Sequence, residues 1–398
     1  MKNGKTVCVM TNGCPENRID GAMMQGFFMK NGWIVTDKYE DADVILFNTC
    51  GLTKDSQDGS IKIINRIKEN KKSSAELIVC GCLSKINKER LDEVYDGITF
   101  GSDEVEKLPD IIGEKRIKTA TRANHLIPRT NVWRFPSLSE MVNPVFVLKL
   151  LTRLLYAWPK NGNTVFNPQT YYIKVSTGCL DACSYCGVKF SRGKLRSKPL
   201  SAVIEEFDEG LANGYTDFAL IATDLGAYGR DYGITLATLL EEMVKRDGEY
   251  KIMLRNVHPR YLIEMMPDLW EIFRSGKISY LGAAVQSGND RILRLMKRRY
   301  SVDDFKRTIL TMNNEFPEIR LNTQIMVGFP SETDEEFSDT IRLLDDIHFD
   351  FVEVYIYQDR PRTRASKIEE SVPRSVATRR FYRLYFRSLF KEYKVLVW

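Results

Sequence analysis

The sequence predicts an α/β protein with an N-terminal doubly wound parallel-sheet domain, a partial (β/α)6 barrel and a C-terminal helix. Short apolar runs alternate with segments of helical apolar spacing in residues 1–122, and the alternation returns from Thr170 onward. Cysteines follow several predicted strands, at the edge where parallel sheets bind ligands. The chain has 398 residues, 43% hydrophobic and 28% charged, which suits a globular protein of two or three domains.

Residues 1–122 are predicted to form the first domain, in which helices connect three strands. The helical segments between short buried strands suit the crossovers of a parallel sheet. The expected elements are a strand at Lys5–Thr11, a helix at Glu16–Asn31, a strand at Val44–Phe47, a helix at Asp55–Asn70 and a strand at Leu77–Cys80.

One cysteine follows each of these three strands: Cys14, Cys50 and Cys82. Each has a glycine beside it, which lets the backbone approach a ligand closely. Cys8 and Cys80 lie inside strands and are expected to be core residues, with Cys80 as the alternative to Cys82 if one of them is a ligand. Taken alone, this placement leaves open whether the three form a site or are unrelated loop residues.

Residues 123–168 show no β/α pattern and are predicted to be a linker with an amphipathic helix. The apolar run Val142–Pro159 contains Lys149 and Arg153 and is shorter than the roughly 20 apolar residues of a membrane span, so no span is expected. The N-terminus lacks the apolar stretch of a signal peptide, which favours a cytoplasmic protein. The net charge of +5 is small evidence for a polyanionic partner.

Residues 169–358 are predicted to form the six-unit partial barrel, and residues 359–398 a basic, aromatic C-terminal helix. Ser201, Ser301 and Thr333 are expected to cap three of the barrel helices. The expected strands are Tyr171–Ser176, Asp217–Ala222, Lys251–Arg255, Tyr280–Val285, Arg320–Val327 and Phe351–Tyr357.

Three further cysteines, Cys179, Cys183 and Cys186, directly follow the first barrel strand with the spacing C-x3-C-x2-C. Structural zinc sites and electron-transfer iron–sulfur clusters take four protein ligands, so three thiolates leave one metal position open. The sequence therefore predicts a metal cluster that reacts with a further molecule. In a reducing compartment, eight cysteines indicate metal binding or catalysis more than disulfides.

This run, with Tyr185 before the last cysteine, resembles the radical S-adenosylmethionine (SAM) enzymes, and the whole chain resembles their methylthiotransferase subgroup. The matching runs are GCPENRID from Gly13, NTC ending at Cys50, GC ending at Cys82, RGKLRS from Arg192, DLGAYGRD from Asp224, QSG from Gln286 and VGFPSE from Val327. The resemblance implies a sulfur transferase with two [4Fe–4S] clusters. One cluster cleaves SAM to a 5′-deoxyadenosyl radical, and the other delivers a sulfur methylated by a second SAM.

The resemblance also implies residue roles and partners. Cys179, Cys183 and Cys186 would hold the radical cluster, and Cys14, Cys50 and Cys82 the auxiliary cluster. An external electron donor of the flavodoxin or ferredoxin type and a sulfur source would be required. The candidate SAM contacts are Thr223, Asp224, Gln286, Ser287, Arg299 and Gly328.

The chain departs from the family pattern in ways that bear on the substrate. The residues after Tyr357 read as helical and lack the strand pattern of the C-terminal substrate-binding barrel that tRNA-modifying members have. Gln324 stands where the family has an aspartate, and Arg362 and Arg364 extend the turn after the last strand. Arginine suits carboxylate or phosphate recognition, so we expect a peptide or natural-product substrate with an acidic group more than tRNA.

Three alternatives remain open from the sequence. The first is methylthiolation of a hypermodified tRNA adenosine or of a ribosomal-protein aspartate, the known family substrates. The second is a two-cluster enzyme that inserts sulfur or oxidises its substrate without methyl transfer. The third is an iron–sulfur redox sensor, against which the substrate-sized barrel argues.

Overall fold

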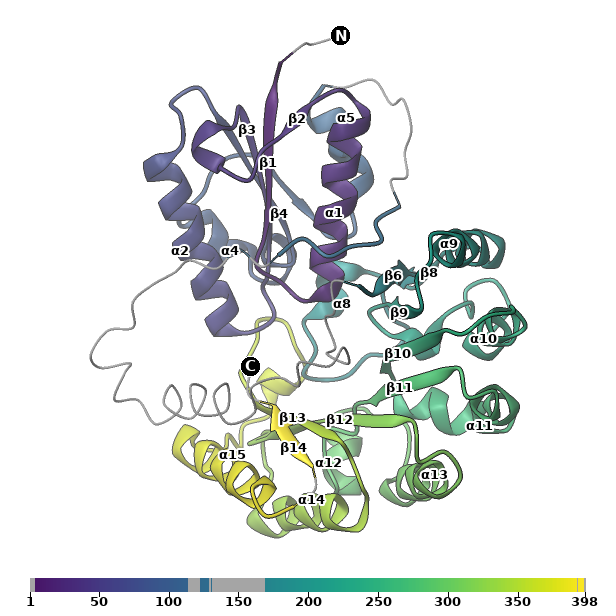
Figure 1. The fold of residues 1–398 in the computed structure, drawn as a ribbon. Helices are drawn as coiled ribbons and strands as arrows, with labels where there is room; N and C mark the ends of the chain where they lie inside the picture. The colour runs from purple at the N-terminus through teal and green to yellow at the C-terminus, as the bar shows by residue number, and fades with distance from the viewer. Residues whose placement is uncertain (1–3, 114–121, 129, 131–168, 392, 397–398) are drawn as a thin grey trace.

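A computed structural model describes residues 4–113, 122–128, 130, 169–391 and 393–396. Two β/α units pack together, the first at the top of Figure 1 and the second below it. This confirms the predicted α/β fold class, with an N-terminal parallel sheet and a C-terminal helix. The predicted helix within 142–159 lies outside the described residues.

The first unit is a five-stranded parallel sheet in the order β2-β1-β3-β4-β5. Its strands are β1 (Thr6–Thr11), β2 (Ile34–Val35), β3 (Val44–Thr49), β4 (Glu76–Gly81) and β5 (Thr99–Gly101). The helical segments are α1 (Pro15–Lys30), η1 (Tyr39–Asp41), α2 (Lys54–Asn70), α3 (Leu83–Ile86), α4 (Lys88–Asp92), η2 (Val105–Lys107) and α5 (Leu108–Ile111). The three predicted strands are present, whereas the edge strands β2 and β5 are too short to give a periodic signal.

Helices α1 and α2 cover opposite faces of this sheet, as a doubly wound topology requires (Figure 1). Ile19 and Phe28 of α1 pack with Val7 and Leu46 on one face. On the other face Ile63, Ile64 and Ile67 of α2 pack with strand residues that include Cys8. Cys8 and Cys80 are 2% and 0% exposed, so both are core residues, as predicted.

The second unit is an open seven-stranded parallel sheet in the order β14-β13-β12-β11-β10-β9-β6. Its strands are β6 (Tyr171–Lys174), β9 (Asp217–Ile221), β10 (Lys251–Val257), β11 (Ile278–Ala283), β12 (Arg320–Val327), β13 (Phe351–Ile356) and β14 (Lys394–Leu396), and β7 (Ser176–Thr177) pairs antiparallel with β8 (Arg196–Ser197). The six predicted strands are present. Strand β14 was not predicted: the C-terminal helix ends at Ser388, and β14 then pairs with β13.

Helices line the outer side of the second sheet (Figure 1). The helical segments of this unit are α8 (Val188–Arg192), α9 (Leu200–Ala212), η3 (Leu225–Ala227), α10 (Leu236–Val244), α11 (Pro259–Arg274), α12 (Asp290–Leu295), α13 (Val302–Glu315), α14 (Asp334–Asp346), η4 (Ala365–Lys367) and α15 (Arg374–Ser388), of which α8 lies at the first unit and packs on α3. Ser301 caps α13, and Thr333 with Glu336 forms a capping box at α14, as predicted. The prediction for Ser201 was wrong, because the carbonyl of Pro199 already accepts the first helical bonds of α9.

The two units share a hydrophobic cluster. Tyr172, Ala219 and Ile221 of the second sheet pack in one buried cluster with Ile19 and Met24 of α1. Apolar contact of this kind fixes α1 against β6 and β9, and therefore fixes the strand ends of one unit relative to those of the other.

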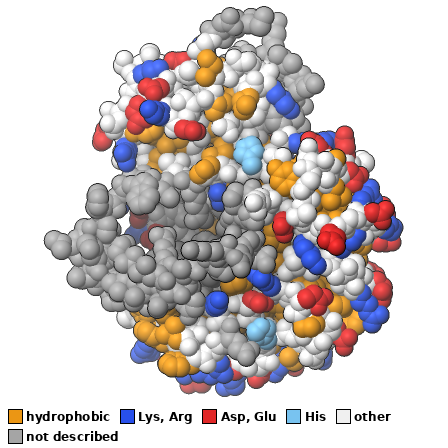
Figure 2. All heavy atoms as spheres, in the orientation of Figure 1, with side chains coloured by type: hydrophobic (Ala, Val, Ile, Leu, Met, Phe, Trp, Pro, Cys, Tyr) orange, Lys and Arg blue, Asp and Glu red, His pale blue; other side chains and the backbone are white. Residues whose placement is uncertain are grey.

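The surface carries mixed charge. On the face in Figure 2, acidic and basic side chains are interspersed over the helices of the second unit. Among the residues that the structure describes, no helix has the length and apolar character needed to cross a membrane.

Candidate active site

The first cysteine trio, Cys179, Cys183 and Cys186, lies in the loop after β7. The Asp181 amide donates to Cys179 Sγ at 3.2 Å, and the Cys186 amide donates to the Cys183 carbonyl at 3.2 Å. Burial raises the pKa of the Cys179 and Cys186 thiols, and the nearby charge of Cys183 raises both further. Three thiols therefore share one poorly solvated loop.

Charged side chains surround this trio. Arg298, 7% exposed, places Nη1 3.5 Å from Cys183 Sγ. Asp224, at the end of β9, lies on the other side, where Cys179 Sγ donates to its Oδ2 at 3.7 Å. Burial, followed by the charge of Asp181, raises the pKa of Asp224 to about 7. The loop thus has a guanidinium near one thiol and a carboxyl near another.

The second trio, Cys14, Cys50 and Cys82, lies at the carboxyl edge of the first sheet. Cys14 precedes α1, Cys50 follows β3 and Cys82 follows β4. Burial raises the pKa of Cys14 to about 12, and the charges of Cys82 and Cys50 add to this rise. Cys82 Sγ lies 3.6 Å from both Asn17 Oδ1 and Ser102 Oγ. The structure therefore brings the three strand-end cysteines together.

The two trios lie next to each other across the boundary between the units. Helix α3, which begins directly after Cys82, packs against α8, which begins two residues after Cys186. A Cβ added to Gly187 would lie 3.4 Å from Ile86 Cγ2 and 3.5 Å from Arg360 Cδ. Burial lowers the pKa of Arg360, and the thiolates of Cys186 and Cys50 are among the charges that oppose this shift. The Arg360 guanidinium therefore lies near both trios.

The residues that the sequence suggested as SAM contacts divide into two groups. Thr223, Asp224 and Gln286 lie at strand ends of the second unit. Thr223 Oγ1 accepts from the Gly178 amide, next to the first cysteine trio, at 3.1 Å. Gln286 adopts a left-handed φ of 76° where its backbone pairs with β12. Ser287 is fully buried, and its hydroxyl contacts Thr340 at 3.5 Å.

Two other suggested contacts have different surroundings from those expected. Arg299 is exposed, whereas its neighbour Arg298 is buried beside Cys183. Gly328 accommodates α15, because a Cβ there would lie 2.4 Å from Ala377 Cβ. The contact roles of these residues stay predictions.

The arginines suggested as substrate contacts bind the protein or face solvent. Arg362 donates to the Lys85 and Ile86 carbonyls at the end of α3 and stacks on Phe190, with 4.6 Å from its Cζ to the ring centroid. Arg364 is exposed. Sequence reasoning gave no role to Arg298, Arg360 or Arg192, although Arg192 begins a run that resembles the family. Of these three, only Arg192 lies close to the cysteines in the sequence, six residues after Cys186.

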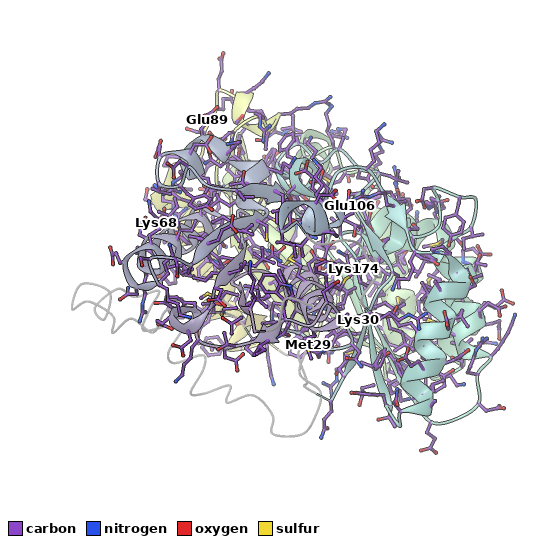
Figure 3. The ribbon with its side chains drawn as sticks, turned by 90° about the horizontal axis from the view of Figure 1, so that it is seen from above. Met29, Lys30, Lys68, Glu89, Glu106 and Lys174 are labelled. Atoms are coloured by element: carbon purple, nitrogen blue, oxygen red, sulfur yellow. The ribbon has the colours of Figure 1, made fainter. Side chains whose placement is uncertain are left out.

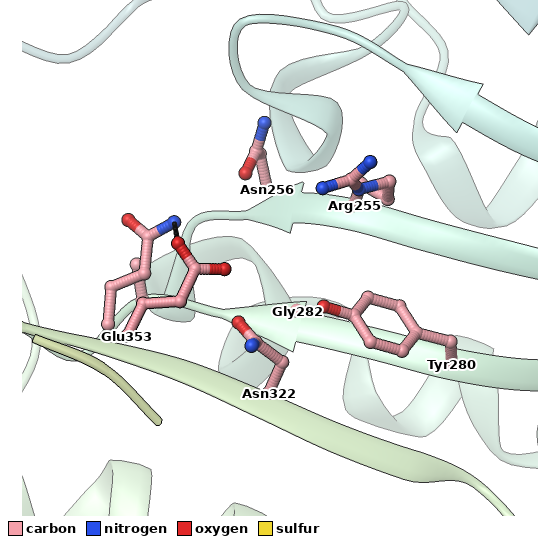
Figure 4. Close-up of a pocket in the computed structure, with 8 residues that line it drawn as sticks. Arg255, Asn256, Tyr280, Gly282, Asn322 and Glu353 are labelled. Atoms are coloured by element: carbon pink, nitrogen blue, oxygen red, sulfur yellow. Dashed lines mark hydrogen bonds between the residues drawn. The ribbon is translucent and has the colours of Figure 1, made fainter. Parts of the chain in front are cut away.

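A polar pocket lies on the inner face of the second sheet (Figure 4). It has a volume of about 10 Å³, enough for one water molecule. Gln324 Nε2 donates to Glu353 Oε2 at 3.3 Å, and Asn322, which is 3% exposed, has an unpartnered Nδ2. The other lining residues are Arg255, Asn256, Tyr280, Gly282 and Ala284.

The donor atoms of both trios fit iron–sulfur clusters better than single metal ions. In a tetrahedral zinc site with Zn–S bonds of about 2.3 Å, the sulfur atoms lie about 3.8 Å apart. Among the described residues, no three cysteines bring their sulfur atoms within 4.8 Å of one another. Each trio therefore leaves room for a larger group, and three thiolates suit a cluster with one open iron.

Comparison with known proteins places the chain in a family. Residues 6–101 match a model described as "Uncharacterized protein family UPF0004", and residues 173–344 match the radical SAM superfamily. A probable threonylcarbamoyladenosine tRNA methylthiotransferase of Methanothermobacter thermautotrophicus is 31% identical, covering 92% of this chain and 80% of that protein. A tRNA-2-methylthio-N(6)-dimethylallyladenosine synthase of Geobacillus thermodenitrificans is 30% identical, covering 96% of this chain and 70% of that protein.

Among solved structures, the radical SAM methyltransferase TsrM of Kitasatospora setae, with cobalamin and a [4Fe-4S] cluster bound, has a similar fold. The TM-score is 0.62 at 14% identity, covering 91% of this chain and 77% of that one. This likeness concerns the fold alone. Together with the sequence relatives, the two paired domains show that this chain belongs to the radical SAM methylthiotransferase family.

Proposed function

We propose that Cys179, Cys183 and Cys186 hold the cluster that binds SAM, and that Cys14, Cys50 and Cys82 hold the cluster that supplies sulfur. As a family member, the enzyme uses [4Fe–4S] clusters and SAM. The observation that carries the proposal is that α3, which begins directly after Cys82, packs against α8, which begins two residues after Cys186.

The bound groups supply one-electron cleavage of SAM and a methylthio group. In the net reaction one C–H hydrogen of the substrate leaves in 5′-deoxyadenosine, and a C–S bond to a methylthio group replaces the C–H bond. One SAM gives methionine and 5′-deoxyadenosine, and a second SAM gives its methyl group and becomes S-adenosylhomocysteine. Sulfide from an external source supplies the sulfur and loses its proton. The electron from a flavodoxin- or ferredoxin-type donor is regained when the C–S bond forms.

The chain's own residues hold this chemistry in place. Cys50, Cys82 and Cys183 are buried and the other three cysteines are half-buried, which limits the access of water to reactive groups at both sites. Arg298 lies beside Cys183, and a fixed positive charge there stabilises an anionic cluster. Arg360 lies near Cys186 and Cys50 and can hold an anionic group of the substrate between the two sites.

For the substrate, we propose an N6-modified adenosine of tRNA, because the sequence relatives are named for such substrates. The polar side chains on the inner face of the second sheet, among them Gln324 and Glu353, suit a substituent with hydrogen-bonding groups, such as threonylcarbamoyl, better than the apolar dimethylallyl group. A peptide or natural-product intermediate is the second candidate. Among the described side chains on the face in Figure 2, acidic and basic groups are interspersed without a continuous basic patch, which favours this second candidate.

Iron analysis and product assays test the proposal. Anaerobically reconstituted wild type is expected to hold about eight irons, and Cys14→Ala and Cys183→Ala about four each. The buried core variant Cys80→Ala is the matched control and should retain the wild-type iron content. Wild type with dithionite and SAM should release 5′-deoxyadenosine. It should also methylthiolate tRNA whose threonylcarbamoyladenosine does not yet carry a methylthio group.

Specific outcomes would contradict the proposal. If wild type holds four irons that survive Cys14→Ala, the two-cluster assignment is wrong. If 5′-deoxyadenosine is made but no S-adenosylhomocysteine forms, sulfur insertion or oxidation without methyl transfer replaces methylthiolation. Absence of 5′-deoxyadenosine favours a redox sensor.

A further inference from the structure

We propose that Arg192 is a positioning residue that fixes the distance and orientation between the two cysteine trios. It belongs to the second unit, at the end of α8, and binds the side chains of Glu16, Asn17 and Asp20 on α1 of the first unit. We call these four residues the interdomain clamp. The inference rests on the proposed function, because it assigns the clamp a role in transfer between the two sites.

Arg192 is the most completely buried arginine among the described residues, at 1% exposure. Its Nη1 binds Asp20 Oδ2 and lies 3.4 Å from Glu16 Oε1, while its Nη2 donates to Asn17 Oδ1 at 2.6 Å. Asp20 also binds Lys174 of β6, which is labelled between the two units in Figure 3. The guanidinium fork thus engages three side chains that lie within two turns of one helix.

The clamp reaches both trios through hydrogen bonds. On one side, Asn17 Oδ1 accepts from Arg192 and also lies 3.6 Å from Cys82 Sγ, so Arg192 and Cys82 share one acceptor. On the other side, Glu16 accepts from Thr223 Oγ1 at 3.0 Å, and Thr223 accepts from the amide of Gly178, the residue before Cys179. A continuous path of polar contacts therefore joins the loop of one trio to a thiol of the other.

The sequence positions of the clamp residues match this role. Glu16, Asn17 and Asp20 lie two to six residues after Cys14, which is the N-cap of α1, so a shift of α1 moves that cysteine. Arg192 follows Cys186 by six residues and ends the short helix that packs on α3. A buried charge network of this kind permits few alternative arrangements, because each displaced charge loses its partner in a poorly solvated place.

A transfer reaction depends on this placement. Misplacing reacting groups by about 1 Å can lower a rate by about 100-fold, even when the groups themselves are intact. Without the clamp, the site at Cys179, Cys183 and Cys186 would still support SAM cleavage, but the site at Cys14, Cys50 and Cys82 would no longer be held in position to deliver sulfur to the substrate. The expected signature is uncoupling: 5′-deoxyadenosine is still made, and less methylthio product forms for each molecule of it.

The test compares Arg192→Met and Arg192→Lys with the control Arg122→Met. Arg122 also pairs with the second unit, through Glu205 and Glu209, but these contacts are exposed. The probe substrate is tRNA whose threonylcarbamoyladenosine does not yet carry a methylthio group. The measured quantity is the ratio of methylthiolated product to 5′-deoxyadenosine. In Arg192→Met this ratio should fall by about 10-fold or more while iron content and 5′-deoxyadenosine formation stay near wild type.

The conservative variant separates positioning from stability. Lysine keeps the charge and can reach Asp20, but it cannot bind Asn17 at the same time, so Arg192→Lys should restore part of the ratio. Glu16→Gln, which keeps the side-chain shape, should lower the ratio in the same direction. It stands in for Arg192→Met if that variant does not fold.

A second measurement is independent of activity. In cluster-free protein, amide hydrogen exchange within 14–20 and 188–195 should become faster in Arg192→Met and stay unchanged in Arg122→Met. Unchanged exchange together with an unchanged product ratio overturns the inference. Parallel loss of product and 5′-deoxyadenosine at full iron content also overturns it. If wild type makes no product from this tRNA, the proposed substrate fails, and the exchange experiment alone decides whether the clamp exists.

Discussion

Replacing Gly178 with alanine should specifically damage the loop that carries Cys179, Cys183 and Cys186. Gly178 precedes Cys179 and has a φ of +84°, a region that side chains with a Cβ rarely adopt. A Cβ added there would lie 2.1 Å from the carbonyl oxygen of Lys194, far inside van der Waals contact. The backbone must therefore move, and the Gly178 amide, which donates to Thr223 Oγ1 at 3.1 Å, moves with it.

The magnitude follows from three contributions. The left-handed conformation costs alanine about 1–2 kcal/mol, and forcing an extra carbon against backbone costs about 1–3 kcal/mol. Reduced entropy of the unfolded chain offsets about 0.4–1 kcal/mol. We expect Gly178→Ala to lower the free energy of unfolding by about 2–4 kcal/mol, with a loss of iron from the Cys179 site.

Gly214→Ala is the matched control. Gly214 has a similar φ of +80°, but a Cβ there meets nothing within 4 Å. This variant should lose only about 0–1.5 kcal/mol, since the steric contribution is absent. Urea unfolding of the cluster-free proteins gives the two free energies, and iron analysis after reconstitution gives the occupancy. Equal destabilisation of both variants, or full iron content in Gly178→Ala, would refute the close-approach argument.

Three further predictions concern the second unit. Arg380→Met leaves the buried Glu332 without the guanidinium that lies 2.7 Å from its carboxylate. This variant should lower the free energy of unfolding by about 3–5 kcal/mol in urea titrations, and a loss below 1 kcal/mol would contradict the expectation. Thr333→Ala removes the capping box of α14 and should cost about 1 kcal/mol by the same assay, with unchanged iron content. Burial, aided by Asp181, raises the pKa of Asp224 from 3.8 to about 7 in the cluster-free protein. The folded state then holds a proton that the unfolded chain has lost, so stability should fall between pH 4 and pH 7, by at most about 1.4 kcal/mol per pH unit. Asp224→Asn should flatten this slope, and an unchanged slope would assign it to other groups.

Much of the candidate site could be predicted because its cysteines follow local patterns. Cys179, Cys183 and Cys186 lie within eight residues, so spacing alone places them together. Cys14, Cys50 and Cys82 are far apart in sequence, but each follows a strand of one parallel sheet. A predicted strand order was therefore enough to place them at one edge.

The arginines around the trios were harder to predict. Arg298 and Arg299 are adjacent and chemically identical, and only the course of the chain after α12 decides which one is buried beside Cys183. Arg362 was expected to face the substrate, yet it binds carbonyls of α3 in the other unit. No local pattern encodes such a contact, because its partner is more than 270 residues away.

The sequence by itself determined the α/β class, the six main barrel strands and the two sets of three thiols, since hydrophobic periodicity and short motifs are local properties. Only the tertiary structure decided that the two trios adjoin across α3 and α8, and that Arg192 binds α1. The three residues of β14 likewise become a strand only beside β13. The physical reason is that packing and buried ion pairing join residues from separate segments, whose meeting depends on the whole fold.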